Sequence, residues 1–419
     1  MAQTFSFLDR MIMGLLVGPI RESFSISDFQ YSLLAGLAFS LFYAIMGLPL
    51  ARIADSGNRR NLISLGIAVW SVMTAVCGMA RGFVSLFFAR IGVGVGEATL
   101  GPAGYSMITD YFPRSSLARA LSVYTLGVTF GSGLAYILGG AVVGYVQTIE
   151  TIKLPLLGAT EGWQLTFFIV GLPGILVAAL LYSTVREPVR RQSETHATMP
   201  PIRTVIDFVW QRRGAYLSHI FGVSIFVMVV YALNLWGPTY FIRTFDYSVA
   251  EAGFTFGIIM LAAGSAGLLL AGVIADAWMQ SGKIDAYVRI ILFSIVAMTP
   301  CAIALGFVQT PGLAIATMSL AVFFSAFQGG IAGGTLQLMT PNRMRAQVMA
   351  VYLLAANLIG LGLGPTVLAA TTDYVFGYDE AIGKSIALCA AILCPLGGLL
   401  LWSGLGKIRE EISAQLENN

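Results

Sequence analysis

Residues 29–60 read FQYSLLAGLAFSLFYAIMGLPLARIADSGNRR, a long apolar run that ends in an arginine-rich link. The apolar part, Phe29–Leu50, is long enough to cross about 30 Å of hydrocarbon as a helix. The link carries Arg52, Arg59 and Arg60, which a bilayer interior would exclude. This stretch therefore predicts a membrane-spanning helix followed by a short charged loop.

Similar apolar runs recur along the whole chain. Of its 419 residues, 57% are hydrophobic and 11% are charged, whereas a soluble domain carries about 25% charged residues. The predicted spans are Phe5–Phe24, Phe29–Leu50, Leu62–Ala80, Phe83–Tyr111, Leu117–Val146, Leu165–Val185, Tyr216–Phe241, Ala252–Ala275, Val288–Val308, Gly312–Met339, Ala346–Ala370 and Ala381–Leu405. We therefore expect an all-α protein with twelve helices embedded in a lipid bilayer.

The basic residues test this topology because alternate loops fall on alternate sides of the membrane. Seventeen of the 24 Lys and Arg residues lie on one side and five on the other. Basic loops stay in the cytoplasm, which places both termini there and favours the plasma membrane, in bacteria the inner membrane. The first span contains Asp9 and Arg10, so we expect no cleavable signal peptide. Only four residues precede this span, which suggests that the natural chain continues upstream.

The longest predicted cytoplasmic connection separates six spans from six. We expect an N-terminal bundle at 1–185, a linker at 186–214, a C-terminal bundle at 215–405 and a tail at 406–419. Within the linker, Ile202–Arg213 mixes apolar residues with arginines, as an interfacial amphipathic helix would. An ordinary solvated linker is the alternative.

Two sequence motifs occur in both halves of the chain. Ala51-Arg-Ile-Ala-Asp55 recurs as Gly272-Val-Ile-Ala-Asp276, and Pro113-Arg114 with Ala120–Tyr124 recurs as Pro341-Asn342 with Val348–Tyr352. The two motifs are displaced along the chain by nearly equal distances. This similarity indicates a duplicated six-span unit, with a substrate site between the halves near the middle of the membrane.

The segment Ala51–Arg60 resembles the signature between the second and third spans of the major facilitator superfamily, Gly-x-Leu-x-Asp-Arg-x-Gly-Arg-Arg. Asp55, Arg59 and Arg60 match this signature, and Asn58 gives a pattern similar to that of the Spinster-like branch. Further matches are Asp9-Arg10, Gly94-Val-Gly-Glu97-Ala98 and Trp236-Gly-Pro238. The resemblance covers essentially the whole chain. It implies the major facilitator fold, two pseudo-symmetric six-helix bundles.

Four ionisable residues lie at depths that a bilayer should exclude: Asp9, Arg10, Arg90 and Glu97. Arg10 lies as far along the chain from Phe24 as Glu97 lies from Phe83, so both lie about 21 Å below the extracellular surface. If the first and fourth helices are neighbours, as the resemblance implies, Arg10 and Glu97 form a pair across a cavity.

This cluster suggests proton coupling. Burial in a partly dry cavity raises the pKa of a carboxyl group, and a nearby arginine lowers it, so moving the arginine changes proton affinity. We predict that Asp9 and Glu97 are the groups that take up protons, with Arg10 as their movable partner. Arg90 would bind an anionic head group or anchor Glu97. The structural alternative is a permanent ion-pair network that only holds the helices together.

The C-terminal half has no acid at comparable depth, so we expect it to recognise substrate by shape and hydrogen bonds. The candidate substrate-binding residues are Arg10, Arg90, Glu97, Phe130, Tyr136, Tyr231, Asn234 and Gln328. Ordinary packing is the alternative role for the aromatic residues.

The resemblance also implies a conformational switch loop made of Asp55, Arg59, Arg60 and, as a weaker echo, Asp276. Asp55 would lie against the positive N-terminal end of the eleventh helix, near Met344–Ala346, and the two arginines would hold it there. A basic loop that only fixes the topology is the alternative.

The resemblance implies export of an amphiphile such as a lysolipid or sphingosine-1-phosphate by alternating access. A proton-driven antiporter of drugs or small organic anions is the alternative within transport, and a receptor or channel is the alternative outside it. We expect no enzymatic activity, because no histidine lies near a nucleophile. We also expect no metal or other cofactor, no nucleic-acid partner and a monomer.

Overall fold

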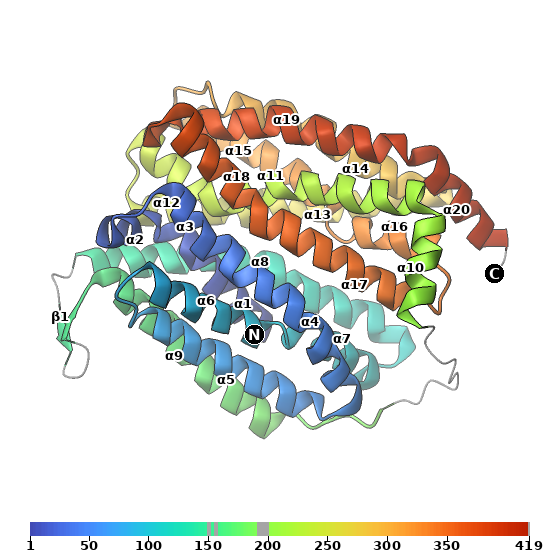
Figure 1. Ribbon diagram of the computed structural model, residues 1–419, viewed down its shortest axis with the longest axis horizontal. Coiled ribbons are helices and arrows are strands. Elements are labelled where there is room, and N and C mark those ends of the chain that lie inside the picture. The colour runs from blue at the N-terminus through green and yellow to red at the C-terminus, as the bar shows by residue number, and fades with distance from the viewer. Residues whose placement is uncertain (149–151, 155–157, 191–200, 418–419) are drawn as a thin grey trace. The chain divides into compact units, whose positions relative to one another are not determined.

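The computed structural model describes residues 1–148, 152–154, 158–190 and 201–417, which are mainly helical (Figure 1). Within these residues, eleven helices are long and apolar enough to cross a membrane, and they correspond to the second to twelfth predicted spans. The first predicted span is also helical, but it is divided at Ile12–Leu15, where the helix tightens, and at Leu16. The predicted all-α membrane fold is thus confirmed. A short two-stranded hairpin, which was not predicted, lies between the fifth and sixth spans.

The first half of the chain builds its spans from several helical pieces. These are α1 (Ala2–Met11), η1 (Ile12–Leu15), α2 (Val17–Phe24), α3 (Asp28–Ser32), η2 (Leu33–Leu37), α4 (Ala38–Ser56), α5 (Arg59–Cys77), α6 (Phe83–Glu97), α7 (Leu100–Tyr111), α8 (Arg114–Gln147) and α9 (Gly162–Thr184). The strands β1 (Ile152–Leu154) and β2 (Gly158–Thr160) pair antiparallel.

The second half begins with a short helix where the linker was predicted. Its elements are α10 (Ile202–Gln211), α11 (Arg213–Phe245), α12 (Val249–Ile259), η3 (Met260–Gly264), α13 (Ser265–Gln280), α14 (Ala286–Ala304), α15 (Pro311–Ser325), η4 (Ala326–Gln328), α16 (Ile331–Met339), α17 (Arg345–Ala355), η5 (Ala356–Leu363), α18 (Gly364–Ala370), η6 (Thr371–Phe376), η7 (Asp379–Ala381), α19 (Ile382–Ser403) and α20 (Leu405–Glu417).

The chain folds into two compact units that do not coincide with its sequence halves. Unit 1 comprises Met1–Gln192, Asn234–Leu261 and Thr372–Glu380, and unit 2 comprises Ser193–Leu233, Ala262–Thr371 and Ala381–Asn419. Unit 1 therefore includes segments from both halves of the sequence. The bundle boundaries expected at 185 and 215 stay a prediction.

The internal repeat is visible in the backbone. Ser27 and Ser248 occupy corresponding places in the two halves, and each begins a helix as the N-cap of a capping box. A π-helical turn follows each of these helices, η2 after α3 and η3 after the longer α12. Glu97 and Ser325, which also correspond, each end a helix at a break within a predicted span. The fourth and tenth spans are thus interrupted at equivalent places, and Glu97 lies at one of these interruptions.

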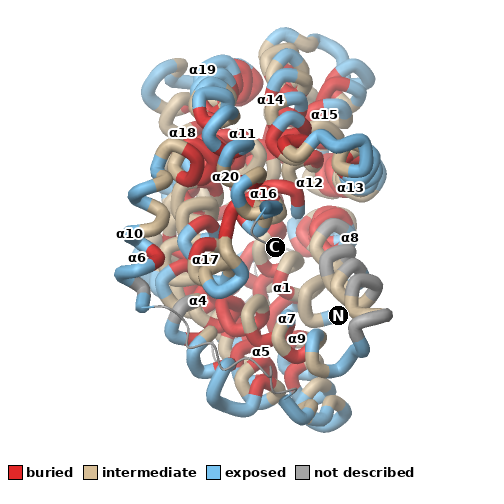
Figure 2. Tube along the Cα trace, turned by 90° about the vertical axis from the view of Figure 1, so that its right-hand side faces the viewer, coloured by how far each residue is buried: buried red, intermediate tan, exposed pale blue. Residues whose placement is uncertain are grey.

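Within unit 1, α5 lies against α9 (Figure 1). This approach needs glycine, because a Cβ atom at Gly174 would lie 2.1 Å from the hydroxyl oxygen of Ser71. Buried and exposed residues alternate along most helices (Figure 2). The close contact holds α5 in place, and α5 carries Arg59 at its first residue and Thr74 near its other end.

Candidate functional site

The interior of unit 1 holds an ion pair between α1 and α6. Arg10 Nε donates to Glu97 Oε2 at 2.6 Å. The hydroxyl of Ser6, one turn earlier on α1, donates to the same oxygen at 2.6 Å. The pairing expected from depth and from the helix arrangement that the resemblance implies is present, while Ser6 was not predicted. Because Glu97 is the last residue of α6, its carboxylate lies where the helix is interrupted.

Aromatic rings surround the guanidinium group of Arg10. The rings of Phe39 and Tyr43 lie 4.7 Å from its central carbon, and the ring of Phe7 lies at 5.1 Å. Phe39 also contacts Arg90, at 5.3 Å. Aromatic faces attract cations most strongly where water is excluded. These rings therefore stabilise two positive charges inside an apolar bundle. The i, i+4 spacing of Phe39 and Tyr43 on α4 only hints at this role.

Asp9 and Arg90 complete the cluster, and both are buried. Among the residues that the structure describes, Asp9 Oδ1, Glu97 Oε1 and two guanidinium nitrogens of Arg90 have no hydrogen-bond partner. Thr74 of α5 lies beside Asp9. Buried polar atoms without partners are unfavourable, and native proteins keep few of them outside functional sites. The cluster thus has carboxylate oxygens that could accept further hydrogen bonds and guanidinium nitrogens that could donate them.

Two of the predicted substrate-binding residues already bond each other. Buried Tyr136 on α8 donates its hydroxyl proton to the backbone carbonyl of Asn234 on α11. This carbonyl would normally accept from residue 238, but Pro238 has no N–H group. Tyr136 thus satisfies a carbonyl that proline leaves free, a structural function that the sequence analysis did not foresee.

The other predicted substrate-binding residues are more accessible. Phe130 on α8 is exposed in unit 1. Tyr231 and Gln328 are half-buried in unit 2, Gln328 in the short turn that interrupts the tenth span. Their part in substrate binding stays a prediction.

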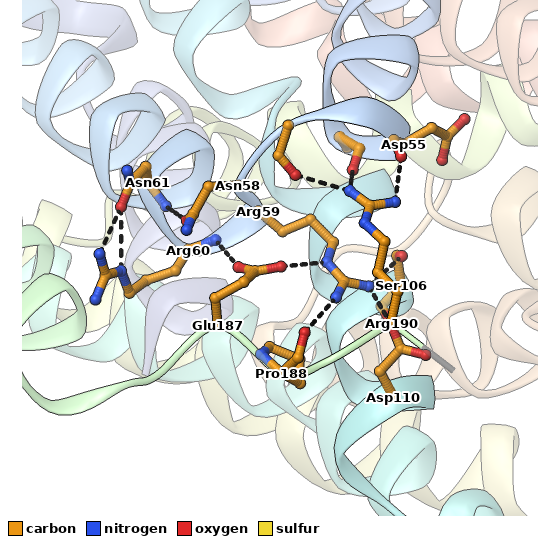
Figure 3. Close-up of polar contacts among 12 residues, drawn as sticks. Asp55, Asn58, Arg59, Arg60, Asn61, Ser106, Asp110, Glu187, Pro188 and Arg190 are labelled. Carbon is orange, nitrogen blue, oxygen red and sulfur yellow. Dashed lines mark hydrogen bonds and ion pairs between the residues drawn. The ribbon is translucent and has the colours of Figure 1, made fainter. Parts of the chain in front are cut away.

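Arg59 lies at the centre of a second polar cluster in unit 1 (Figure 3). Its side chain is 1% exposed and forms ion pairs with Asp110 and, at 2.7 Å, with Glu187. It also donates to the Ser106 hydroxyl and the Pro188 carbonyl. Glu187 additionally accepts from the backbone N–H of Arg60 at 2.9 Å, where a negative charge favours the start of α5. Neither Asp110 nor Glu187 was predicted from the sequence as a partner of Arg59.

Arg190 caps the helix that precedes this cluster. Its guanidinium donates to the backbone carbonyls of Asp55 and, at 2.7 Å, of Ala54 and Gly57. These carbonyls at the end of α4 have no helical partner, and a cation is favourable there.

The carboxylates of the predicted switch residues are exposed. Asp55 lies in unit 1, with its carboxylate pointing away from Arg59 (Figure 3), and Asp276 lies in unit 2. Arg60 contacts Asn61 and stacks over Tyr182 at 4.7 Å. The expected contact of Asp55 with Met344–Ala346 would join the two units and stays a prediction.

Unit 2 contains a charge-inverted counterpart of the Arg59 cluster. Asp285, the N-cap of α14, is buried and accepts from Arg289 at 2.8 Å and from Arg409 at 2.5 Å. Burial alone would raise the pKa of Asp285, but the hydrogen bonds and charges of the two arginines together lower it below its ordinary value. The carboxylate therefore favours the folded state while it is ionised.

This lowered pKa predicts a loss of stability in acid. Above the pKa of an unfolded aspartate, about 4, the stabilisation is fully present, and it is lost as pH falls through the lower folded value. We expect the melting temperature of the detergent-solubilised protein to fall less between pH 5 and 3 (roughly the window in which an aspartate titrates) in Asp285→Asn than in the unmodified protein. Parallel melting curves for the two proteins would contradict this assignment.

Comparison with known proteins places these features in a family. The family model of the Major Facilitator Superfamily matches residues 1–365. A bacterial homologue of the human lysosomal transporter Spinster, solved in an inward-facing and occupied conformation, is 30% identical with a TM-score of 0.76, covering 99% of this chain and 91% of that one.

Two further relatives carry different names from each other. An MFS-type efflux pump of Mycolicibacterium smegmatis is 25% identical over 98% of this chain and 91% of its own length. The human protein spinster homolog 1 is 26% identical over 57% of this chain, and the match spans 44% of that protein.

The fold and these comparisons define a secondary transporter, a membrane protein that carries a small molecule rather than an enzyme. The chain belongs to the Major Facilitator Superfamily. The predicted superfamily and its Spinster-like branch are confirmed by these matches.

Proposed function

We propose that this protein is a proton-coupled secondary active transporter that works by alternating access. The observation that carries the proposal is the Arg10–Glu97 ion pair beside buried Asp9, inside helices expected to cross a bilayer. Charged groups at that depth are expensive and are kept mainly where they serve transport. Family membership supports a transporter over a receptor or a channel.

Arg10 would be the element that links proton binding to the conformational change. The proton affinity of a carboxylate depends on whether an arginine lies beside it. In the observed arrangement Arg10 neutralises Glu97. A movement of α1 that separated them would leave Glu97 in an apolar bundle without a counter-ion, so the carboxylate would take up a proton. Asp9 is the second proton-binding group, and Arg90 balances its charge.

The substrate that we favour is an amphiphile exported from the cell, with an anionic or zwitterionic head and an acyl tail, like a lysolipid or sphingosine-1-phosphate. Similarity to a bacterial homologue of Spinster supports this class, as do buried Arg90 and half-buried Arg10 near the end of α6, where the fourth span is interrupted. Substrate contacts would come from Arg10, Arg90, Glu97, Phe130, Tyr136, Tyr231, Asn234 and Gln328. An antiporter of drugs is the second candidate, because an efflux pump is similar over 98% of this chain.

The predicted switch loop would act with this site. Asp55 would meet the N-terminal end of α17 in one conformation, and Arg59 and Arg60 would shape the loop that presents it. The charge bias of 17 against five basic residues supports termini in the cytoplasm. Protease protection of a C-terminal tag in sealed vesicles of known orientation would test that placement.

Purified protein in proteoliposomes tests the proposed function. With an imposed pH gradient, we expect movement of a lysolipid or of sphingosine-1-phosphate from a panel that also includes cationic dyes. The double variant Asp9→Asn/Glu97→Gln should not respond to the gradient. The matched variant Glu22→Gln/Glu410→Gln, which neutralises two exposed acids, should respond normally.

Each outcome of this assay has a meaning. Unchanged transport and pH dependence in the Asp9/Glu97 variant would end the coupling proposal. Gradient-driven movement of dyes alone would favour the drug antiporter.

A further inference from the structure

One end of unit 1 carries a ring of four charged side chains. Arg243, in the last turn of α11, binds both carboxylate oxygens of Asp28, with N–O distances of 2.6 and 2.8 Å. Arg21 on α2 lies 3.1 Å from Asp28 and 2.5 Å from Asp379 in η7. Arg243 lies 3.5 Å from Asp379, which closes the ring. We call Arg21, Asp28, Arg243 and Asp379 the arginine–aspartate ring.

Asp28 is the central member of the ring. Its side chain is 1% exposed, against 46% for Asp379. A carboxylate withdrawn from water in this way depends on its partners, and a bidentate arginine is the strongest of them. If Asp28 lost its charge, the exposed Asp379 would be the ring's one remaining carboxylate for Arg21 and Arg243. The ring is therefore held together mainly by one buried carboxylate.

Beneath the ring lies a layer of tightly packed apolar and aromatic groups. Tyr31 and Trp236 are fully buried, with ring centroids 6.3 Å apart, and the Arg243 guanidinium lies 5.9 Å from the Trp236 ring. Nearby, α12 approaches α8 so closely that a Cβ atom at Gly253 would lie 2.6 Å from the Tyr136 carbonyl oxygen. The same end of unit 1 is thus closed by charge on the outside and by packing below.

The ring joins parts of the chain that alternating access must separate. Arg21 and Asp28 come from the first two spans, whereas Arg243 and Asp379 come from the seventh span and the start of the twelfth. A contact that links the sequence halves at one end must break whenever a transporter opens there. We propose that Asp28 is the gate residue at this end, where it locks the closed state through both arginines. This inference rests on the alternating-access cycle proposed above.

Cysteine labelling tests the gate directly. The four native cysteines are replaced by serine, and Ala35, which is buried one turn beyond Tyr31, is changed to cysteine. A membrane-impermeant maleimide is then applied to each membrane face in turn. We expect Asp28→Asn to speed labelling from one face by about tenfold, because about 1.4 kcal/mol of lost gate stabilisation is a tenfold change in open population. Arg243→Gln should do the same.

The control is Glu22→Gln, which neutralises an exposed acid next to Arg21 outside the ring. It should label at the reference rate, which is the rate of the Ala35→Cys protein with no change in the ring. If Asp28 and Arg243 act as a unit, the double variant should label no faster than the faster single variant.

Reference-rate labelling in a folded Asp28→Asn protein, judged by gel filtration, would overturn the gate, and so would fully multiplicative effects in the double variant. Asp28→Glu, which keeps the charge, tests the same point if Asp28→Asn does not fold, and it should label more slowly than Arg243→Gln. The assay needs neither substrate nor a proton gradient, so failure of proton coupling would leave its result intact.

Discussion

Replacing Arg59 with glutamine is expected to destabilise the protein by about 3 kcal/mol, the low end of the range for breaking a buried ion pair. The reason is the number of groups that this side chain satisfies. Asp110 and Glu187 would both lose their charge partner, and the Pro188 carbonyl and Ser106 hydroxyl would lose a donor. Glutamine reaches at most one of these groups, so two carboxylates would be left close together in a partly dry site.

Thermal unfolding in detergent measures this effect, with Arg60→Gln as the matched control. Arg60 is adjacent in sequence and carries the same charge, but its contacts are a hydrogen bond to Asn61 and stacking on the exposed Tyr182 ring, worth about 0.5–1 kcal/mol. We therefore expect a much larger fall in melting temperature for Arg59→Gln. Equal shifts in melting temperature for the two variants would mean that Arg59 contributes only its positive charge and that its hydrogen bonds and ion pairs do not hold the surrounding segments together. Lys at position 59 should restore little, because it cannot contact two carboxylates as a planar fork does.

The depth of a charged residue in the membrane could be predicted from the sequence, whereas the side chains that contact it mostly could not. Every residue of a helix adds the same rise along its axis, so counting from span ends placed Arg10 and Glu97 at one level. Their 2.6 Å contact follows from that level and from the family's helix arrangement. Counting residues does not give the direction in which a side chain points. Phe39 and Ser6 were therefore missed although both touch the same pair.

The ring and the Arg59 cluster show the same limit more strongly. Asp28 and Arg243 are 215 residues apart and lie at span ends, where charged residues are ordinary. Only the folded chain shows that Asp28 is buried against Arg243. Tyr136 is a different case, because Pro238 already implied a free carbonyl at Asn234. That signal was in the sequence, although the donor could not be identified from it.

Replacing Arg10 with glutamine is expected to reduce proton-driven transport by at least about 100-fold. Glu97 would keep its buried position and its bond from Ser6 but lose its counter-ion. About 3 kcal/mol of lost pairing corresponds to roughly two orders of magnitude, and it would act on the step in which the carboxylate is ionised. Arg10→Lys should keep part of the activity, because an ammonium group retains the charge. This ammonium group fits less well than a planar guanidinium group between the rings of Phe7, Phe39 and Tyr43.

Initial rates in proteoliposomes, measured with a pH gradient and separately as substrate exchange without one, decide what Arg10 does. A proton-coupling residue should lose gradient-driven flux while keeping exchange, since exchange needs no net proton movement. A side chain that only holds helices together should lose both equally. Arg90→Gln provides the contrast, because two guanidinium nitrogens of Arg90 have no hydrogen-bond partner among the described residues. If Arg90 instead proved to be the residue whose loss removes gradient-driven flux while exchange survives, the switch would belong to Asp9 and Arg90, and the Arg10–Glu97 pair would be a structural cross-link.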